Sequence, residues 1–523
     1  MNMRRSPGFT AGALAALACA CSGPDRNVDH AVGPMDVSSV TDHVVFVDHG
    51  RNEALVLDVS GNARQAASPS VVPLVTNPIS VVSRKKHPDD LLVLSLGQPD
   101  DGVAAPEQPG LTLIDAKGKN RGYRYDSAFD ALAQSDDGRS ALLYFTQSAG
   151  AGGAVLFNPN EIAILDLDQT DAPQVLTPRP LGGTIQHVAF SPPDFAIDGV
   201  PRRLAVTLFD SYLNILDLDH LDRSEFSVEL EQTKNSAIHL AQVLFSSTES
   251  KIYVRATGTD NVFVLSLLPR TPPEAKQNDF SPSVTQLPAG SGPTDLALFD
   301  DGDKHRLLVA SPGSNEVIVV DSDSNNVTNV PLGAPGTSIL LFRGTSPTDA
   351  VVAPRALVYT PGSTVVTFVD LTKLTEEGAR NVERHDLSEA YSAAVQLDDH
   401  TVMLPHVNTG LSLLDLSERT ISIISGPSLN GAVSDPAVNK LWLAHANKVG
   451  YLDLAKDSHP NEVRVDAVID TLVTVPGASP KVVVTHKSGT GWATVLDAKN
   501  PNDLSAAYSV RGFFLDGVLQ GGG

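Results

Sequence analysis

One line of sequence recurs, with variations, from near the start of the chain to near its end. In each copy a strand-like apolar run leads into a short polar turn, and a second apolar run ends in Asp, often as Leu-Asp-Leu or Val-Asp-Leu. Clear copies lie at residues 43–59, 203–218, 306–321, 356–371 and 440–454. Self-similarity at a period of about 20–50 residues is typical of repeat architectures, and it therefore constrains the fold class more than any local pattern does.

The spacing of the closing Asp gives the size of the repeated unit. Successive closing positions are 38 to 57 residues apart, which is too long for one hairpin and matches about four short strands with their turns. Ser266 takes the place of Asp in the gap after Asp217. The closing Asp residues are Asp58, Asp115, Asp166, Asp217, Asp321, Asp370, Asp415, Asp453 and Asp497.

Two further strands flank each pair of apolar runs. Short Ala/Val/Leu segments precede the pairs, at 130–138, 185–194, 293–302 and 391–400, and polar alternating strands follow them, at 325–333, 419–426 and 461–470. Tandem four-stranded units predict an all-β fold, a β-propeller of about ten four-stranded blades in a single ring. A smaller ring with extra sheets and a pair of rings are the alternatives.

Two further segments carry expectations of their own. Residues 376–393 favour one or two turns of helix. Residues 509–520 are apolar and strand-like, and by their position they are expected to add a strand that closes the ring against the first sheet. The closing Asp itself is expected to accept hydrogen bonds from backbone N–H groups of the following turn, as Asp commonly does in turns.

One repeat carries a specific resemblance. Leu307 to Ser311, followed by Gly313-Ser314-Asn315 and by Glu316 to Asp321, is similar to the YVTN-type propeller repeat, and the preceding turn at 299–302 matches as well. The resemblance covers about residues 41–520. It implies a propeller in an extracytoplasmic location, in a broad group that includes lactonase-like enzymes, surface proteins and binding modules. It implies no particular reaction.

The first 21 residues form a targeting segment. Arg4 and Arg5 precede a small apolar run that is too short to span a bilayer as a helix. The run ends in Cys19-Ala20-Cys21-Ser22-Gly23, which resembles a bacterial lipoprotein signal with Cys21 as the lipidated residue. Cys19 as the lipidated residue and a plain secretory signal are the alternatives. Residues 22–40 are then a polar tether, and 41–523 the propeller.

Net charge and cysteine content limit the classes of partner that the protein can bind and the bonds that it can form. The formal net charge is −23, which argues against nucleic acid and anionic membrane, because both need clustered Lys and Arg. Both cysteines lie in the targeting segment, so the body of the protein is expected to hold no disulfide. The membrane is expected to be contacted only through the N-terminal lipid. By resemblance to other lipoproteins, Ser22 after Cys21 favours the outer membrane, and we expect a monomer there.

Four units carry His in the same place, at the end of the second strand: His49, His406, His445 and His486. In a closed ring the four sheets are adjacent. Imidazole nitrogens from neighbouring blades can bind Zn²⁺ or Cu²⁺, with Asp48 and Asn408 as further oxygen donors. The alternatives are His residues that cap turns and a polar rim that binds a ligand without metal.

Other catalytic patterns are missing from the sequence. There is no Gly-x-Ser-x-Gly elbow, no His-Glu-x-x-His and no Walker loop. Asp321-Ser322-Asp323 begins like a calcium loop, but Asn326 and Leu332 replace the required Gly and Glu. These patterns favour a non-catalytic binding module for an envelope protein or glycan, without a cofactor. A metal-dependent or lactonase-like enzyme with a His-lined central face is the alternative.

Overall fold

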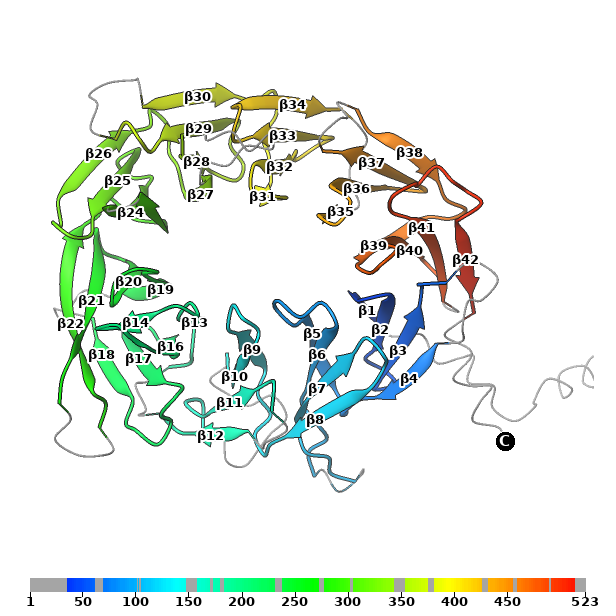
Figure 1. Cartoon of the computed structure of the whole chain (residues 1–523), viewed down its shortest axis with the longest axis horizontal. Coiled ribbons are helices and arrows are strands. Elements are labelled where there is room, and N and C mark those ends of the chain that lie inside the picture. Colours follow the sequence, from blue (N-terminus) through cyan, green and yellow to red (C-terminus); the bar gives the residue numbers. More distant parts are fainter. Residues whose placement is uncertain are drawn as a thin grey trace, which may run out of the picture.

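The structure is a ring of ten four-stranded antiparallel sheets, which confirms the predicted all-β propeller (Figure 1). It is a computed structural model. It describes residues 35–61, 69–100, 102, 105–146, 158–169, 173–178, 183–230, 238–271, 277–301, 304–342, 353–374, 381–425, 431–454, 459–488 and 491–512. Within these residues, no helix is long and apolar enough to cross a membrane.

Each sheet is one blade, and its strands are lettered A to D from the ring interior outward. The A strands are β1 (Met35–Val40), β5 (Pro78–Ser83), β9 (Ala131–Gln134), β13 (His187–Phe190), β19 (His239–Phe245), β23 (Asp295–Asp301), β27 (Ser338–Phe342), β31 (Val395–Gln396), β35 (Gly431–Asp435) and β39 (Ile469–Val475). The B strands are β2 (His43–Asp48), β6 (Asp90–Ser95), β10 (Ser140–Tyr144), β16 (Leu204–Leu208), β20 (Lys251–Thr257), β24 (Lys304–Ser311), β28 (Arg355–Tyr359), β32 (Thr401–Pro405), β36 (Lys440–His445) and β40 (Lys481–His486).

The outer half of each blade is built in the same way. The C strands are β3 (Glu53–Asp58), β7 (Gly110–Asp115), β11 (Ile162–Asp166), β17 (Tyr212–Asp217), β21 (Asn261–Pro269), β25 (Glu316–Asp321), β29 (Val365–Asp370), β33 (Leu411–Asp415), β37 (Lys448–Asp453) and β41 (Trp492–Asp497). The D strands are β4 (Ser70–Pro73), β8 (Asn120–Arg124), β12 (Gln174–Leu176), β18 (Phe226–Glu229), β22 (Phe280–Pro288), β26 (Val327–Pro331), β30 (Val382–Asp386), β34 (Thr420–Ile424), β38 (Asn461–Arg464) and β42 (Tyr508–Arg511). A small hairpin, β14 (Ala196–Ile197) with β15 (Val200–Pro201), interrupts blade 4.

The hydrophobic core lies between the blades. Strands B and C are buried along most of their length, whereas D strands such as β8 and β26 bury few side chains. The packing of blade 2 on blade 3 is typical: Leu92 and Leu94 share one cluster with Ala141 and Leu143. Both faces of a sheet are therefore covered, which explains why the sequence shows continuous apolar runs and not a strict alternation.

The ring closes without a shared strand. Blade 1 and blade 10 are each built from one continuous stretch of chain, and they meet through a joint core that includes Phe46 and Val483. The Asp42 N–H donates to the Pro476 carbonyl over 2.8 Å, and the Tyr508 hydroxyl donates to the Val59 carbonyl over 3.4 Å. The seam is thus held by packing and a few hydrogen bonds.

Three expectations need correction. Residues 35–40 form β1, inside the stretch predicted as tether, because their small and β-branched side chains suit an innermost strand. Residues 508–511 form β42 and pair with β41 of their own blade, not with the first sheet; residues 513–523 lie outside the described part. Residues 382–386 form β30, because pairing with Val365–Val369 satisfies their backbone better than a helical turn would.

Candidate functional site

The ring has two faces, which the strand directions define. The upper face carries the B–C turns and the connections between blades. The lower face carries the A–B and C–D turns. In blade 1, for example, the B–C turn follows Asp48, whereas the A–B turn holds Asp42 and the closing Asp58 lies opposite His43 at the lower end of the sheet.

The four His side chains lie at the upper end of strand B in blades 8, 9, 10 and 1, which are consecutive around the seam. His406 Nε2 lies 2.8 Å from the Ser412 hydroxyl, and His486 Nε2 lies 2.8 Å from the Thr494 hydroxyl, in both cases within one blade. His445 is buried at the corresponding position of blade 9. The sequence therefore identified a position that is equivalent in these three blades. At this position His406 and His486 form hydrogen bonds with hydroxyl groups on strand C of their own blade.

His49 differs from the other three. Its Nδ1 lies 2.6 Å from the Pro78 carbonyl at the start of the neighbouring blade, and its Nε2 lies 3.0 Å from a carboxylate oxygen of Asp36. Asp48 accepts the N–H groups of Gly50 and Arg51 and so caps its own turn.

The metal site predicted at these four positions stays a prediction. Among the described residues, no group of three or more His, Cys, Asp or Glu side chains is arranged to hold a metal ion. His486 is 4% exposed, and burial lowers its pKa despite hydrogen bonds to backbone carbonyls nearby. A neutral ring with Nδ1–H directed at the Val468 carbonyl leaves Nε2 to accept the Thr494 proton, which is the pattern of a structural histidine.

The closing Asp organises the lower face. Its carboxylate accepts backbone N–H groups of the C–D turn, as expected: Asp415, for example, accepts from Ser417 and Glu418. The same bond recurs at Asp58, Asp115, Asp166, Asp217, Asp321, Asp370 and Asp497. The turn after Asp453 lies partly outside the described residues.

A second recurrent contact links four of these turns to the preceding blade. A basic side chain on strand B, directly opposite the closing residue of its own blade, donates to backbone carbonyls just after the closing Asp of the next blade. We name these side chains latch cations. They are Lys251 to Ser322, Arg306 to Leu371, Arg355 to Leu416 and Ser417, and Lys440 to Ala498 and Lys499.

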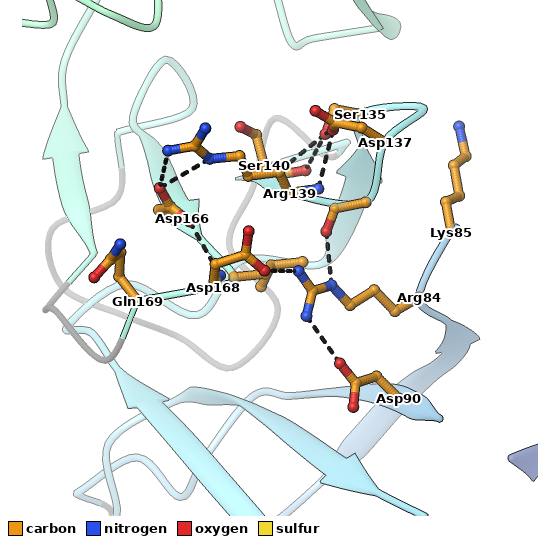
Figure 2. A network of polar contacts seen from close by, with 12 residues as sticks. Arg84, Lys85, Asp90, Ser135, Asp137, Arg139, Ser140, Asp166, Asp168 and Gln169 are labelled. Carbon is orange, nitrogen blue, oxygen red and sulfur yellow. Dashed lines mark hydrogen bonds and ion pairs between the residues drawn. The ribbon is translucent and has the colours of Figure 1, made fainter. Parts of the chain in front are cut away.

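Blade 2 has Asp90, an acidic residue, opposite its closing residue Asp115, and its contact to blade 3 is made by Arg84 instead (Figure 2). Arg84, from the A–B turn, lies between Asp90 of its own blade and Asp168 of blade 3, and its Nε donates to the Gly138 carbonyl over 2.7 Å. Gly138 has a φ of 69°, and a Cβ there would lie 2.0 Å from the Lys85 carbonyl oxygen. The contact between these blades therefore requires glycine.

One junction also opens into a cleft. Between blades 9 and 10, on the lower face and toward the rim, lies an open cavity of about 660 Å³. Most of its lining residues are polar: Lys440, Tyr451, Asp453, Asn461, Lys499, Asn500, Pro501, Asn502 and Asp503. The volume lies in the range of about 300–1,000 Å³ that is usual for small-molecule sites.

The outer wall of the cleft is the connection from β41 to β42. It runs over residues 498–507, whereas the corresponding turn of blade 8 spans only 416–419, and it loops out beside β38 (Figure 1). The loop holds its own shape: Asp503 N–H donates to the Asn500 carbonyl, and the Asp503 carboxylate accepts from Ser505. The Asn502 amide donates to the Tyr451 hydroxyl over 2.7 Å and ties the loop to blade 9.

Sequence reasoning missed both the latch cations and the cleft. The latch had a visible signal, because a basic residue stands 13 to 15 positions before the closing residue in Lys251, Arg306, Arg355 and Lys440. The cleft had no such signal, because the C–D connections of blades 1, 5 and 7 are as long as that of blade 10. Its floor and its wall come from different blades, and no local pattern joins them.

No protein family model and no curated protein sequence matches the chain. Among solved structures, it is similar to the dihydro-heme d1 dehydrogenase NirN in complex with DHE, with 13% identity and a TM-score of 0.42 over 76% of this chain and 79% of that one. It is also similar to apo AztD from Citrobacter koseri, with 13% identity and a TM-score of 0.34 over 69% and 93% of the two chains. Sqt1 from Saccharomyces cerevisiae gives 10% identity and a TM-score of 0.41 over 73% and 95%. Such low values carry no functional inference.

Proposed function

We propose that the protein is a monomeric, lipid-anchored β-propeller of the bacterial outer membrane that acts as a non-catalytic binding module for an envelope protein or glycan. The observation that carries the binding role is the cleft between blades 9 and 10. The loop over residues 498–507 is held in a fixed shape by its own hydrogen bonds and forms the outer wall of an open polar cavity. Preformed concave sites of this size are the usual form of ligand-binding sites.

The chemistry of the lining supports binding over catalysis. Lys440 is 8% exposed and its Nζ is bonded to the Ala498 and Lys499 carbonyls at 3.0 and 3.1 Å, so it acts as a structural cation. Asp503 accepts from the backbone and hydroxyl of Ser505. Lys440 and Asp503 therefore stabilise the walls of the cleft. The side-chain amides of the lining are suited to hydrogen bonding with a ligand.

Support for the envelope location comes from the N-terminal sequence and from the YVTN-type repeat at 307–321. A lipid on Cys21 would hold the propeller at the membrane through residues 22–34. The absence of cysteine after Cys21 leaves the ring independent of the redox state of its compartment.

Fractionation of bacteria that express the full chain tests the anchor. We expect the protein and its Cys19→Ser variant in the outer-membrane fraction, and the Cys21→Ser variant in the soluble fraction. Retention of Cys21→Ser in the membrane would contradict lipidation at this residue.

Binding is tested separately, with immobilised residues 22–523 and purified envelope polysaccharide or detergent-solubilised envelope proteins. Failure of both preparations to bind would contradict the binding role.

A further inference from the structure

Resting on the proposed binding role, we infer that the cleft between blades 9 and 10 takes a neutral, hydroxyl-rich ligand, a short saccharide chain. The first argument is charge. Two carboxylates, of Asp453 and Asp503, stand against two ammonium groups, of Lys440 and Lys499, so the lining is formally neutral. An anion would meet the carboxylates in a protein of net charge −23, and a cation would meet the lysines.

The second argument is the kind of polar group. Asn461, Asn500 and Asn502 contribute amides, and each amide offers donors and an acceptor. Sugar hydroxyls also donate and accept, so a carboxylate or amide can bind two adjacent hydroxyls. Asn502 uses its N–H on Tyr451, which fixes the amide and leaves its carbonyl oxygen as an acceptor of known orientation. Lys440 donates to two carbonyls, and an ammonium group has three N–H donors.

The third argument is the lack of an apolar floor. The Tyr451 ring packs against Trp442 with ring centroids 5.5 Å apart, so this ring contributes to the packing of blade 9. Pro501 is the one aliphatic residue of the lining, which excludes a lipid or an aromatic ligand as the fitting occupant.

The fourth argument is preorganisation. Within the loop, backbone N–H groups of Asp503, Leu504 and Ala506 donate to carbonyls of the same loop, each over 3.0 Å. Asp497 at its base is partly buried, which alone would raise its pKa, but hydrogen bonds from Asn500 N–H and Lys481 hold that pKa below its usual value and keep the carboxylate charged. A wall that is already ordered loses little entropy when a ligand binds.

Saturation-transfer difference NMR and calorimetry with residues 22–523 test the inference. The probes are maltotriose, cellotriose and chitotriose, with trilysine and triglutamate as charged counterparts. We expect at least one trisaccharide to bind and neither charged peptide to compete. Asn461→Ala and Asn500→Ala should each weaken binding about fivefold, the effect of one lost neutral hydrogen bond. Asn329→Ala, on blade 6, is the matched control and should leave affinity unchanged.

The outcomes separate this inference from the proposed function. Absence of binding by all three trisaccharides at millimolar concentration would overturn it, as would binding that Asn461→Ala and Asn500→Ala leave intact. If no trisaccharide binds but the unaltered chain still binds an envelope preparation, the saccharide inference fails and the binding role stands. Thermal unfolding of each variant controls for folding. Asn500 lies on the solvent-exposed loop, so loss of binding by its variant reports on the cleft.

Discussion

At the scale of single residues, the polar groups of this ring serve mainly to join backbone turns. The closing Asp caps the turn after its own strand, and the carbonyls of that turn then accept a cation from the preceding blade. His305 shows a variant of the same design between blades 5 and 6. Its Nδ1 lies 2.9 Å from an Asp300 carboxylate oxygen and 2.9 Å from the Thr248 hydroxyl.

His305 gives a pH dependence with a definite sign. The hydrogen bond to Asp300 raises the pKa of His305 above 6.5 in the folded protein. The folded state therefore binds the proton more tightly, and the stabilisation is complete below pH 6.5 and is lost as the pH rises through the folded pKa. We expect His305→Gln to lower the unfolding temperature more at pH 5.5 than at pH 8.5. Urea or thermal unfolding at both values measures the difference.

Asp300→Asn is the partner variant. It removes the carboxylate, so in that background His305→Gln should lower the unfolding temperature by more similar amounts at the two pH values. An equal destabilisation by His305→Gln at both pH values in the otherwise unaltered protein would contradict a charged contact at this junction.

Residue-level prediction from the sequence succeeded where bonds are local. The Asp-to-turn bond spans two to four residues and followed from turn chemistry alone. The common position of His406, His445 and His486 was also visible, because the strand pattern repeats. The contacts of His406 and His486 were not visible in the sequence, because Ser412 and Thr494 lie on the neighbouring strand across a hairpin.

At the scale of strands and blades, the latch cations connect elements that are far apart in the sequence. Lys440 reaches two carbonyls 58 and 59 residues away, in the next blade. A charge-assisted hydrogen bond of this kind contributes about 1.5–3 kcal/mol. The blade junction is therefore held by specific polar contacts as well as by the apolar cluster that Trp442 and Leu496 share.

Lys440→Met should lower the free energy of unfolding by about 1–3 kcal/mol, because it leaves buried carbonyls without a donor. Lys448→Met is the matched control. Lys448 lies in the same blade and pairs with Glu462 at 2.6 Å, but both side chains are nearly half exposed, so its loss should cost less than about 1 kcal/mol. Chemical denaturation with equal m-values compares the two. Equal effects would show that the latch adds nothing beyond a surface ion pair.

The elements themselves were largely predictable. Alternating apolar runs, turn residues and the spacing of Asp located most strands, because those signals are contained within a single blade. Residues 35–40 and 382–386 were assigned otherwise, since Ser-rich or charged stretches become strands only when a neighbouring strand is already there to pair with.

At the scale of the whole molecule, the seam is the junction whose two blades do not follow one another in the chain. Blades 10 and 1 are joined by side-chain packing and by bonds such as Asp42 to Pro476, without a strand that crosses between them. The sequence predicted the number of blades from the period. It could not predict how the ends meet, because that contact links residues more than 400 positions apart.

A covalent bond across the seam should stabilise the ring. A Cβ at Gly477 would lie 2.8 Å from Cγ of Asp42, which brings the sulfur of a cysteine at 42 within reach of one at 477. We expect the Asp42→Cys/Gly477→Cys protein, residues 22–523 with no other cysteine, to form this disulfide and to unfold at a higher temperature when oxidised. The chain-entropy estimate for a loop of this length exceeds about 4.7 kcal/mol. The same protein after reduction is the control, and equal unfolding temperatures in the two states would contradict a seam that opens during unfolding.

The continuity of each blade has a consequence for how such rings change over time. When a propeller shares a strand between its first and last sheets, duplication of an internal segment must preserve that shared sheet. Here every sheet is complete within one stretch of about fifty residues. Gain or loss of one such stretch therefore adds or removes one blade and leaves every remaining sheet whole. A ten-membered ring can therefore arise from smaller ancestors by copying alone, without any new kind of strand pairing.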